Sequence, residues 1–253
     1  AFKQDYGDHP RSNVNTGMPP YIYMGAQKLA EALLGWDLMG FHPKTGWRAD
    51  GYADAFGSTA SYDPLRTRLT GGQPDTLNER KGHYIELATA NVFRISALYP
   101  AIPNDPYVLC DVYRVRKLTD PNTGKTVFAG SPILYYKANT ANKTIDPTYA
   151  PKTIDRIYDY NDNMFITSTR KLTANGPAGL LHPFSAFGAS GYPVFYSDKY
   201  TGIPNTYGGS GTGYGIRDPQ ISSPKRPCNP DTYILISAGP DGYYGTADDI
   251  HNF

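Results

Sequence analysis

The chain has 253 residues, with 24 Lys and Arg against 23 Asp and Glu, so its formal net charge is +1. A chain of this length can bury a core without disulfides or metals. The balanced charge, with no long run of Lys and Arg, argues against a nucleic acid partner, because phosphate binding needs an excess of positive charge. No stretch approaches the roughly 18 apolar residues of a membrane span, so we expect no membrane partner for the chain in this form.

The composition is rich in Tyr, Gly and Pro, with 22, 26 and 22 residues, and only 19% of the residues are charged. Gly and Pro divide a chain into short elements, and Tyr suits half-buried strands. A Tyr-rich surface with little charge is typical of proteins outside the cytoplasm, so we expect an extracytoplasmic location. Cys110 and Cys228 could pair in such a compartment or remain two buried thiols, and the sequence leaves both options open.

The beginning of the chain predicts an arm followed by a helix. Residues 1–19 are polar and rich in turn formers, which indicates a segment without regular structure. Residues 24–39 carry apolar side chains at helical spacing, with Gly40 and Pro43 as stop signals just beyond. The apolar stripe consists of Ala26, Leu29, Leu33 and Trp36.

The rest of the chain predicts short strands and long connections. Residues 42–75 are dominated by turn formers, and residues 77–98 fit either a helix or a strand. Residues 107–137 predict a β-hairpin region, and residues 232–253 predict a strand that runs into a loop rich in Gly and Asp. Since no repeat and no break in composition marks a boundary, we expect a single α+β domain over residues 1–253.

The final loop carries the most informative pattern of the chain. Fourteen positions, residues 237–250, hold three carboxylates and two small hydroxyl residues, Ser and Thr, around three glycines. Calcium prefers about six to eight oxygen ligands, and a Gly-rich loop lets carbonyls turn inward. An ordinary acidic turn has the same composition, so composition leaves both readings open. The pattern is not that of an EF-hand.

This tail resembles the carboxy-terminus of the major pseudopilins of bacterial type II secretion. In both, an aromatic and aliphatic strand runs into Ser-x-Gly-x-Asp-Gly, then a Gly-rich loop and a final Asn-aromatic pair. Here these motifs are residues 233–242 and 245–253. Further segments are similar to an enlarged, divergent group of pilin-like proteins: 25–33, 40–43, 47–50, 86–91, 107–111 and 130–136.

The resemblance implies a pilin-like head in which an N-terminal helix packs on an antiparallel sheet with long loops. It also implies one bound calcium ion, Ca2+, that orders the C-terminal loop for filament assembly. The loop between the first Asp and the paired Asp residues is shorter here than in the family. The matching oxygens belong to the side chains of Ser237, Asp241 and Asp249, with Asp248 beside them, and to carbonyls near Ile236 and Tyr244.

The same resemblance implies a non-enzymatic structural subunit of a type II secretion pseudopilus or a similar filament. Its partners are other pilin-like subunits, and its place is the periplasm or the cell surface. Members of the family begin with a hydrophobic helix of about 20 residues, which this sequence lacks. We therefore expect the sequence to be the soluble head of a precursor that is anchored in the inner membrane.

Enzyme motifs are incomplete. The five His residues show no zinc-binding spacing. Residues 188–192 lack the last glycine of a nucleophile elbow, and residues 208–213 lack the Lys of a phosphate loop. Asp155, Asp159 and Asp162 could hold a second cation or act as glycosidase acids, but glycosidase acids lie on the walls of a cleft, and one short acidic segment favours a solvated turn instead.

The alternative function is a secreted or cell-surface carbohydrate-binding module. Such a module would use aromatic rings to stack on sugars, and the sequence offers two Tyr pairs for this role. The pairs are Tyr135–Tyr136 and Tyr243–Tyr244.

Overall fold

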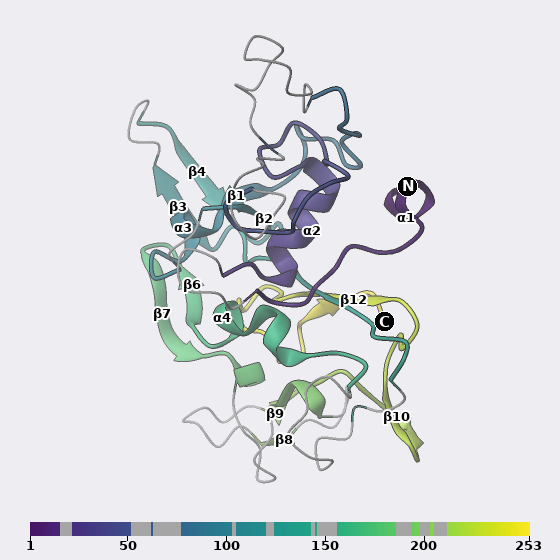
Figure 1. The fold of residues 1–253 in the computed structure, drawn as a ribbon. Helices are drawn as coiled ribbons and strands as arrows, with labels where there is room; N and C mark the ends of the chain where they lie inside the picture. Colours follow the sequence, from purple (N-terminus) through teal and green to yellow (C-terminus); the bar gives the residue numbers. More distant parts are fainter. Residues whose placement is uncertain are drawn as a thin grey trace. The chain divides into compact units, whose positions relative to one another are not determined.

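The computed structural model describes the chain except for ten segments (Figure 1). The segments are residues 16–21, 52–61, 63–76, 103–104, 120–123, 143–144, 146–155, 186–193, 198–202 and 205–211. The chain divides into two compact units, Ala1–Leu109 and Cys110–Phe253. Both combine helices with small antiparallel sheets or strand pairs, so α+β is the fold class at a coarse level. The single domain over residues 1–253 stays a prediction.

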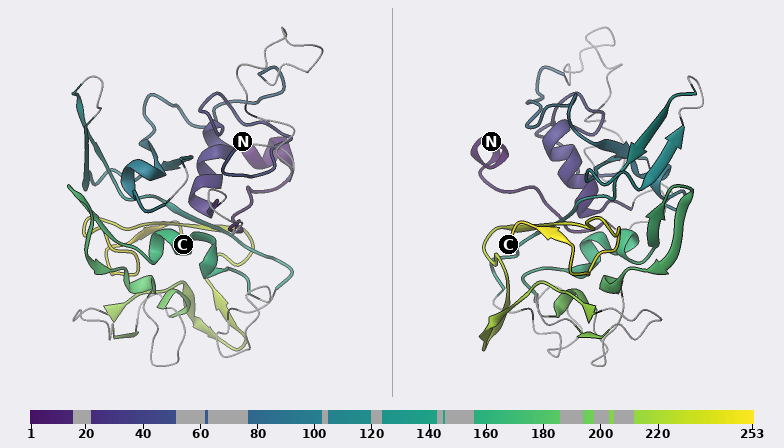
Figure 2. Two further views of the ribbon diagram at one scale, coloured as in Figure 1. Left: turned by 60° about the vertical axis from the view of Figure 1, so that its left-hand side comes forward. Right: turned by 180° about the vertical axis from the view of Figure 1, so that it is seen from behind.

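The Ala1–Leu109 unit is built around one buried helix. Strands β1 and β2 pair antiparallel, with Phe93 opposite Val108, and helix α2 packs against β2 (Figure 2). The elements of this unit are α1 (Phe2–Tyr6), α2 (Gly25–Leu34), β1 (Val92–Arg94), α3 (Ile95–Leu98) and β2 (Tyr107–Leu109).

Helix α2 begins where the sequence predicts it but ends five residues early. Gly35 follows it with φ 93°, a conformation that glycine adopts readily. A Cβ at Gly35 would lie 2.2 Å from the carbonyl oxygen of Gly40, so the chain turns back on itself at this point. The predicted arm also differs from the structure, since residues Phe2–Tyr6 form the short helix α1.

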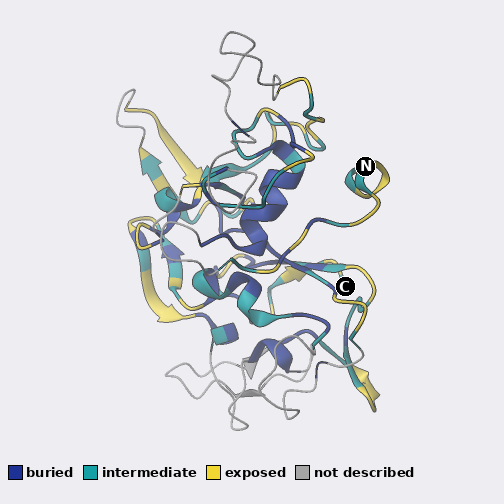
Figure 3. Ribbon diagram, in the orientation of Figure 1, coloured by how far each residue is buried: buried dark blue, intermediate teal, exposed yellow. Residues whose placement is uncertain are grey.

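Polar residues of α2 are buried together with its apolar ones, and most of the helix has the dark blue of buried residues in Figure 3. The Glu31 carboxylate accepts hydrogen bonds from the hydroxyls of Tyr23 (2.5 Å), Thr45 (2.5 Å) and Tyr62 (2.9 Å). Burial would make a lone carboxylate very costly, and three donors offset that cost. This network therefore joins α2 to segments on either side of it in the sequence.

The Cys110–Phe253 unit contains a three-stranded antiparallel sheet in the order β13–β12–β5. The other strands among its described residues form four two-stranded antiparallel pairs: β3–β4, β6–β7, β8–β9 and β10–β11. The strands are β3 (Arg116–Thr119), β4 (Thr126–Ala129), β5 (Leu134–Lys137), β6 (Arg170–Thr173), β7 (Gly176–Leu181), β8 (Ile203–Pro204), β9 (Thr212–Gly213), β10 (Arg217–Ser222), β11 (Lys225–Pro227), β12 (Tyr233–Ser237) and β13 (Ile250–His251). The helical turns are η2 (Tyr160–Asn163), α4 (Met164–Thr167), η3 (Pro183–Ser185) and η4 (Val194–Tyr196).

An aromatic cluster forms the core of this second unit. The ring of Phe195 is fully buried, and its centroid lies 4.8 Å from that of Tyr136 and 5.5 Å from that of Phe184. Tyr135, which precedes Tyr136 in the sequence, is also buried. Since Tyr135 and Tyr136 are both in the core, this pair is not available to stack on sugars.

The local predictions for this unit hold in part. The predicted strand over residues 232–237 is β12, and the hairpin region of residues 107–137 contains β3, β4 and β5 together with β2 of the Ala1–Leu109 unit. Cys110 and Cys228 are unbridged thiols. Residues 188–192, Asp155 and most of the 208–213 loop lie outside the described residues. None of the helices in the described ranges is both long enough and apolar enough to cross a bilayer.

Replacing Tyr62 by Phe tests the buried network. The Tyr62 hydroxyl donates to Glu31 and accepts the His42 N–H at 3.0 Å. We expect the free energy of unfolding to fall by about 1.5–3 kcal/mol in chemical denaturation, because a buried carboxylate loses a donor. The control is Tyr107→Phe, whose half-buried ring packs on the Arg94 guanidinium, and it should change stability by less than about 0.5 kcal/mol. Equal losses of stability in Tyr62→Phe and Tyr107→Phe would contradict a stabilising hydrogen bond from Tyr62 to Glu31.

The Glu31→Gln variant tests the protonation of the buried Glu31 carboxyl. Burial raises the pKa of the Glu31 carboxyl, and the three hydroxyl donors offset this only in part. The folded state therefore binds the Glu31 proton more tightly than the unfolded state does. The protonated carboxyl contributes its full stabilisation below about pH 4, and this stabilisation is lost as pH rises through the folded-state pKa. Melting temperatures measured against pH should show the parent losing stability relative to Glu31→Gln between acid and neutral pH. A difference in melting temperature between the two proteins that stays constant with pH would contradict a raised pKa of Glu31.

Candidate metal centre

The three acidic side chains of the tail lie in one loop that is closed by strand pairing. Residues 238–249 connect β12 to β13, and these strands place Ser237 opposite Ile250 and Ile236 opposite His251. The other edge of β12 pairs with β5. The carboxylates are therefore held between two strands of the sheet rather than in an open chain end.

Tyr244 anchors the middle of this loop. Its side chain is fully buried and its hydroxyl donates to the carbonyl of Pro132. Its backbone N–H donates to His182 Nδ1 at 3.2 Å, and its carbonyl accepts the Phe184 N–H at 3.1 Å. The resemblance implies metal-binding carbonyls near Ile236 and Tyr244, and the carbonyl of Tyr244 itself already accepts one hydrogen bond.

Two glycines allow the loop to close tightly. Gly239 has φ 62°, and a Cβ there would lie 2.2 Å from the carbonyl oxygen of Asp248. Gly245 has φ 94°, and a Cβ there would lie 2.6 Å from Cδ1 of Phe184. Positive φ angles and such close approaches both require glycine.

Asp241 and Asp248 are connected directly within the loop. One Asp248 oxygen accepts the Asp241 N–H at 2.9 Å, and the other accepts the Thr246 hydroxyl at 2.6 Å. The Asp241 carboxylate accepts the Tyr243 N–H at 2.7 Å. These bonds fix both carboxylates on the same loop without a cationic side chain bonded to either in the residues the structure describes.

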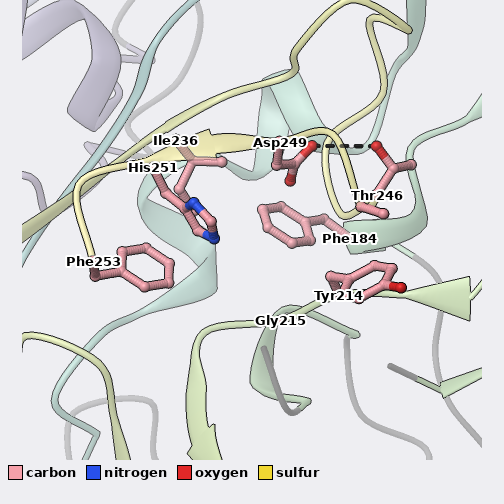
Figure 4. A pocket seen from close by; sticks show the side chains of 9 residues that line it. Phe184, Tyr214, Gly215, Ile236, Thr246, Asp249, His251 and Phe253 are labelled. Atoms are coloured by element: carbon pink, nitrogen blue, oxygen red, sulfur yellow. Dashed lines mark hydrogen bonds between the residues drawn. The ribbon is translucent and has the colours of Figure 1, made fainter. Parts of the chain in front are cut away.

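Asp249 points toward a small cavity beside the loop (Figure 4). Its carboxylate accepts the Gly245 N–H at 2.7 Å and the Thr246 hydroxyl at 3.4 Å. The cavity has a volume of about 90 Å³. Its lining residues are Phe184, Tyr214, Gly215, Ile236, Thr246, Ala247, Asp249, His251 and Phe253.

The three carboxylates repel one another. Burial raises the pKa of Asp249 well above its usual value, and the negative charges of Asp241 and Asp248 raise it further. Burial and the charge of Asp248 also raise the pKa of Asp241. Burial opposes ionisation of Asp248 as well, but its hydrogen bonds with Thr246 and Asp241 outweigh that effect and lower its pKa. A bound cation would relieve this repulsion.

Ser237 stands at the foot of the loop and faces inward. Its hydroxyl donates to Asp111 at 2.8 Å and accepts the Gly239 N–H at 3.2 Å. The other Asp111 oxygen accepts the N–H groups of Tyr113 and Ser131, both at 3.1 Å. Sequence reasoning included Asp111 in a segment of resemblance but gave it no role.

The structure therefore brings Asp241, Asp248 and Asp249 into one loop and places Ser237 at its base. Across the described ranges, no three or more His, Cys, Asp or Glu side chains are grouped so as to hold a metal ion. Hard cations prefer oxygen donors, and every side chain of the predicted set offers oxygen, so the chemistry of the donors fits calcium.

Asp159, Asp162 and His42 lie away from the C-terminal loop in the sequence, and their surroundings are those of structural side chains. Asp159 caps the turn η2 by accepting the Asn161 N–H at 2.9 Å, and Asp162 is buried. His42 Nδ1 accepts the Lys44 N–H at 3.1 Å.

No protein-family model, no curated protein and no solved structure matches this chain.

Gly245→Ala tests the close packing of the loop, with Gly124→Ala as its control. Both glycines have positive φ, but a Cβ at Gly124 meets nothing within 4 Å. The control should cost about 1–2 kcal/mol for the backbone conformation alone. Gly245→Ala should cost about 1–3 kcal/mol more in thermal or chemical unfolding, because the new methyl group overlaps Phe184. Equal losses in the two variants would show that the loop relaxes away from Phe184.

Proposed function

We propose that this chain is the globular head of a pseudopilin-like filament subunit, a structural protein whose C-terminal loop is stabilised by calcium. The observation that carries the proposal is the strand-closed loop with three mutually repelling carboxylates. The resemblance of residues 233–242 and 245–253 to major pseudopilins supports it. The pilin-like form of the α+β fold is part of this proposal.

Calcium would be held mainly by Asp241, Asp248 and Asp249, with loop carbonyls completing the oxygen shell. When bound, the ion supplies positive charge that offsets the repulsion among the three carboxylates. Ser237 supports the site from below, because its hydroxyl is engaged by Asp111 and by the turn at Gly239. The loop then presents one defined shape instead of several.

A defined loop matters for a filament, because every subunit repeats the same heterologous contact. A mobile loop at that contact would lose entropy at each addition of a subunit. Calcium that binds only the folded state orders the loop before a subunit is added, and it stabilises the head by mass action. The high calcium level outside cells suits a subunit that works beyond the cytoplasm.

Calcium should raise the melting temperature of the chain, and a chelator should lower it. At a calcium concentration of about 100 times the dissociation constant, the gain is about 2.7 kcal/mol, or roughly 5–10 °C. Asp241→Ala should abolish the difference between calcium and chelator.

The matched control for this experiment is Asp218→Ala in β10, which removes a carboxylate that accepts only the nearby Gln220 N–H among the bonds described. This variant should keep the full calcium shift. An identical melt with calcium and with chelator would contradict the calcium site, while leaving the fold unaffected.

The filament role is tested by the mass and N-terminal sequence of the protein from its native source. A methylated Phe followed by about 20 apolar residues supports a filament subunit. A mature protein that starts at Ala1 after an ordinary signal peptide contradicts it and favours the secreted carbohydrate-binding module, which a glycan array would then examine.

A further inference from the structure

Two β-hairpins of the Cys110–Phe253 unit, β3–β4 and β6–β7, lie side by side. The backbone N–H of Lys117 donates to the carbonyl of Ala174 at 3.3 Å, and the Arg116 guanidinium donates to the same oxygen at 3.1 Å. All views of the ribbon show the two hairpins as neighbours at one edge of this unit (Figures 1 and 2). We call them the paired hairpins.

The paired hairpins concentrate positive charge. The described residues of 112–119, 124–129 and 170–181 contain six basic side chains and no acidic one, in a chain whose total charge is nearly balanced. Asp120 follows β3 in the sequence and lies outside the described residues. The four exposed basic side chains are Arg114, Lys117, Lys125 and Arg170.

The same region also concentrates exposed apolar side chains. Of the nine large apolar residues that are exposed in the described part of the chain, five lie here, with exposures between 39% and 70%. They are Val112, Val127, Phe128, Leu180 and Leu181. Exposed apolar surface flanked by charge marks an interaction site more often than an inert surface.

Exposed apolar side chains lie on both faces of the β3–β4 hairpin. Val127 and Phe128 are consecutive in β4, so they point to opposite faces, and both are exposed. Leu180 and Leu181 are consecutive in β7 and both are exposed, beside the register shift of the β6–β7 pairing between Arg170 and Leu172. Phe128 is paired with Lys117, so an apolar ring and a positive charge are cross-strand neighbours.

This arrangement favours a lipid surface over a protein partner. A flat protein surface that docks on one face of a hairpin leaves the opposite face in water. The interface of a bilayer surrounds whatever projects into it, so it covers apolar side chains on both faces at once. Lys and Arg next to such side chains meet the phosphates of the headgroups, where each contributes about 1 kcal/mol to binding.

We propose that the paired hairpins are a peripheral membrane-binding surface for anionic phospholipids. Phe128, Leu180 and Leu181 enter the interface, while Lys117 and its basic neighbours contact headgroup phosphates. This surface differs from a membrane-spanning helix, the only kind of membrane contact that the sequence expectation considered. It requires neither a filament nor calcium and therefore goes beyond the proposed function.

Sedimentation with lipid vesicles tests the proposal on the whole chain. One vesicle preparation contains phosphatidylcholine and phosphatidylglycerol, and the other contains phosphatidylcholine alone. The buffer contains a chelator, so that calcium cannot bridge the acidic loop to lipid and the result does not depend on the calcium site. We expect binding to the anionic vesicles only, and we expect it to weaken as salt is added.

Two variants locate the surface. Lys117→Glu and Phe128→Ser each change an exposed side chain, and each should weaken binding to anionic vesicles by an order of tenfold. The controls at exposed positions of the Ala1–Leu109 unit are Lys3→Glu, which makes the same charge reversal, and Met39→Ser, which also replaces a large apolar side chain by Ser. The controls should bind as the parent does.

Three results would overturn the proposal. The first is no binding to anionic vesicles, or equal binding to both preparations. The second is equal binding by Lys117→Glu, Phe128→Ser and their controls. The third comes from beads that carry polyglutamate or a single-stranded oligonucleotide. If these retain the chain and anionic vesicles do not, the surface recognises an acidic protein or a nucleic acid instead of lipid.

Discussion

The buried carboxylate of Asp111 joins three parts of the Cys110–Phe253 unit that are distant in sequence. It accepts hydrogen bonds from the N–H groups of Tyr113 and Ser131 and from the hydroxyl of Ser237. Burial raises the pKa of Asp111, and these donors offset part of that cost. Gly130 makes the approach possible, since a Cβ there would lie 2.1 Å from an Asp111 oxygen. Asp111 thus ties the start of the C-terminal loop, at Ser237, to the segments around residues 113 and 131.

Elements set by neighbouring residues were predictable from the sequence. The start of α2 follows from apolar spacing, and β12 follows from a short aliphatic run bounded by turn formers. The end of α2 was not predictable. It depends on how closely Gly35 approaches Gly40, and apolar spacing continues past it without any sign of that contact.

The candidate metal site was also predictable from the sequence only where its residues are neighbours in the chain. Asp241, Asp248 and Asp249 share one short loop, so their proximity was visible in the sequence. The bond between Ser237 and Asp111 spans 126 positions and leaves no local pattern. The positive surface of the paired hairpins was missed for a related reason, because its basic residues are spread over three segments and form no run of Lys and Arg.

Helix α2 has a consequence for how this chain changes over evolutionary time. Its buried Lys28 donates to the carbonyl of Asn13 and to the side chain of Asn15, and its buried Glu31 depends on three hydroxyl donors. A substitution at Glu31 removes the acceptor of the buried Tyr23 and Tyr62 hydroxyls, and a substitution at Lys28 removes a donor to two acceptors in the segment of Asn13 and Asn15. Divergence there must proceed by concerted exchange of whole groups of residues, so related chains should keep these sets intact or replace them together, while ordinary apolar positions drift one at a time.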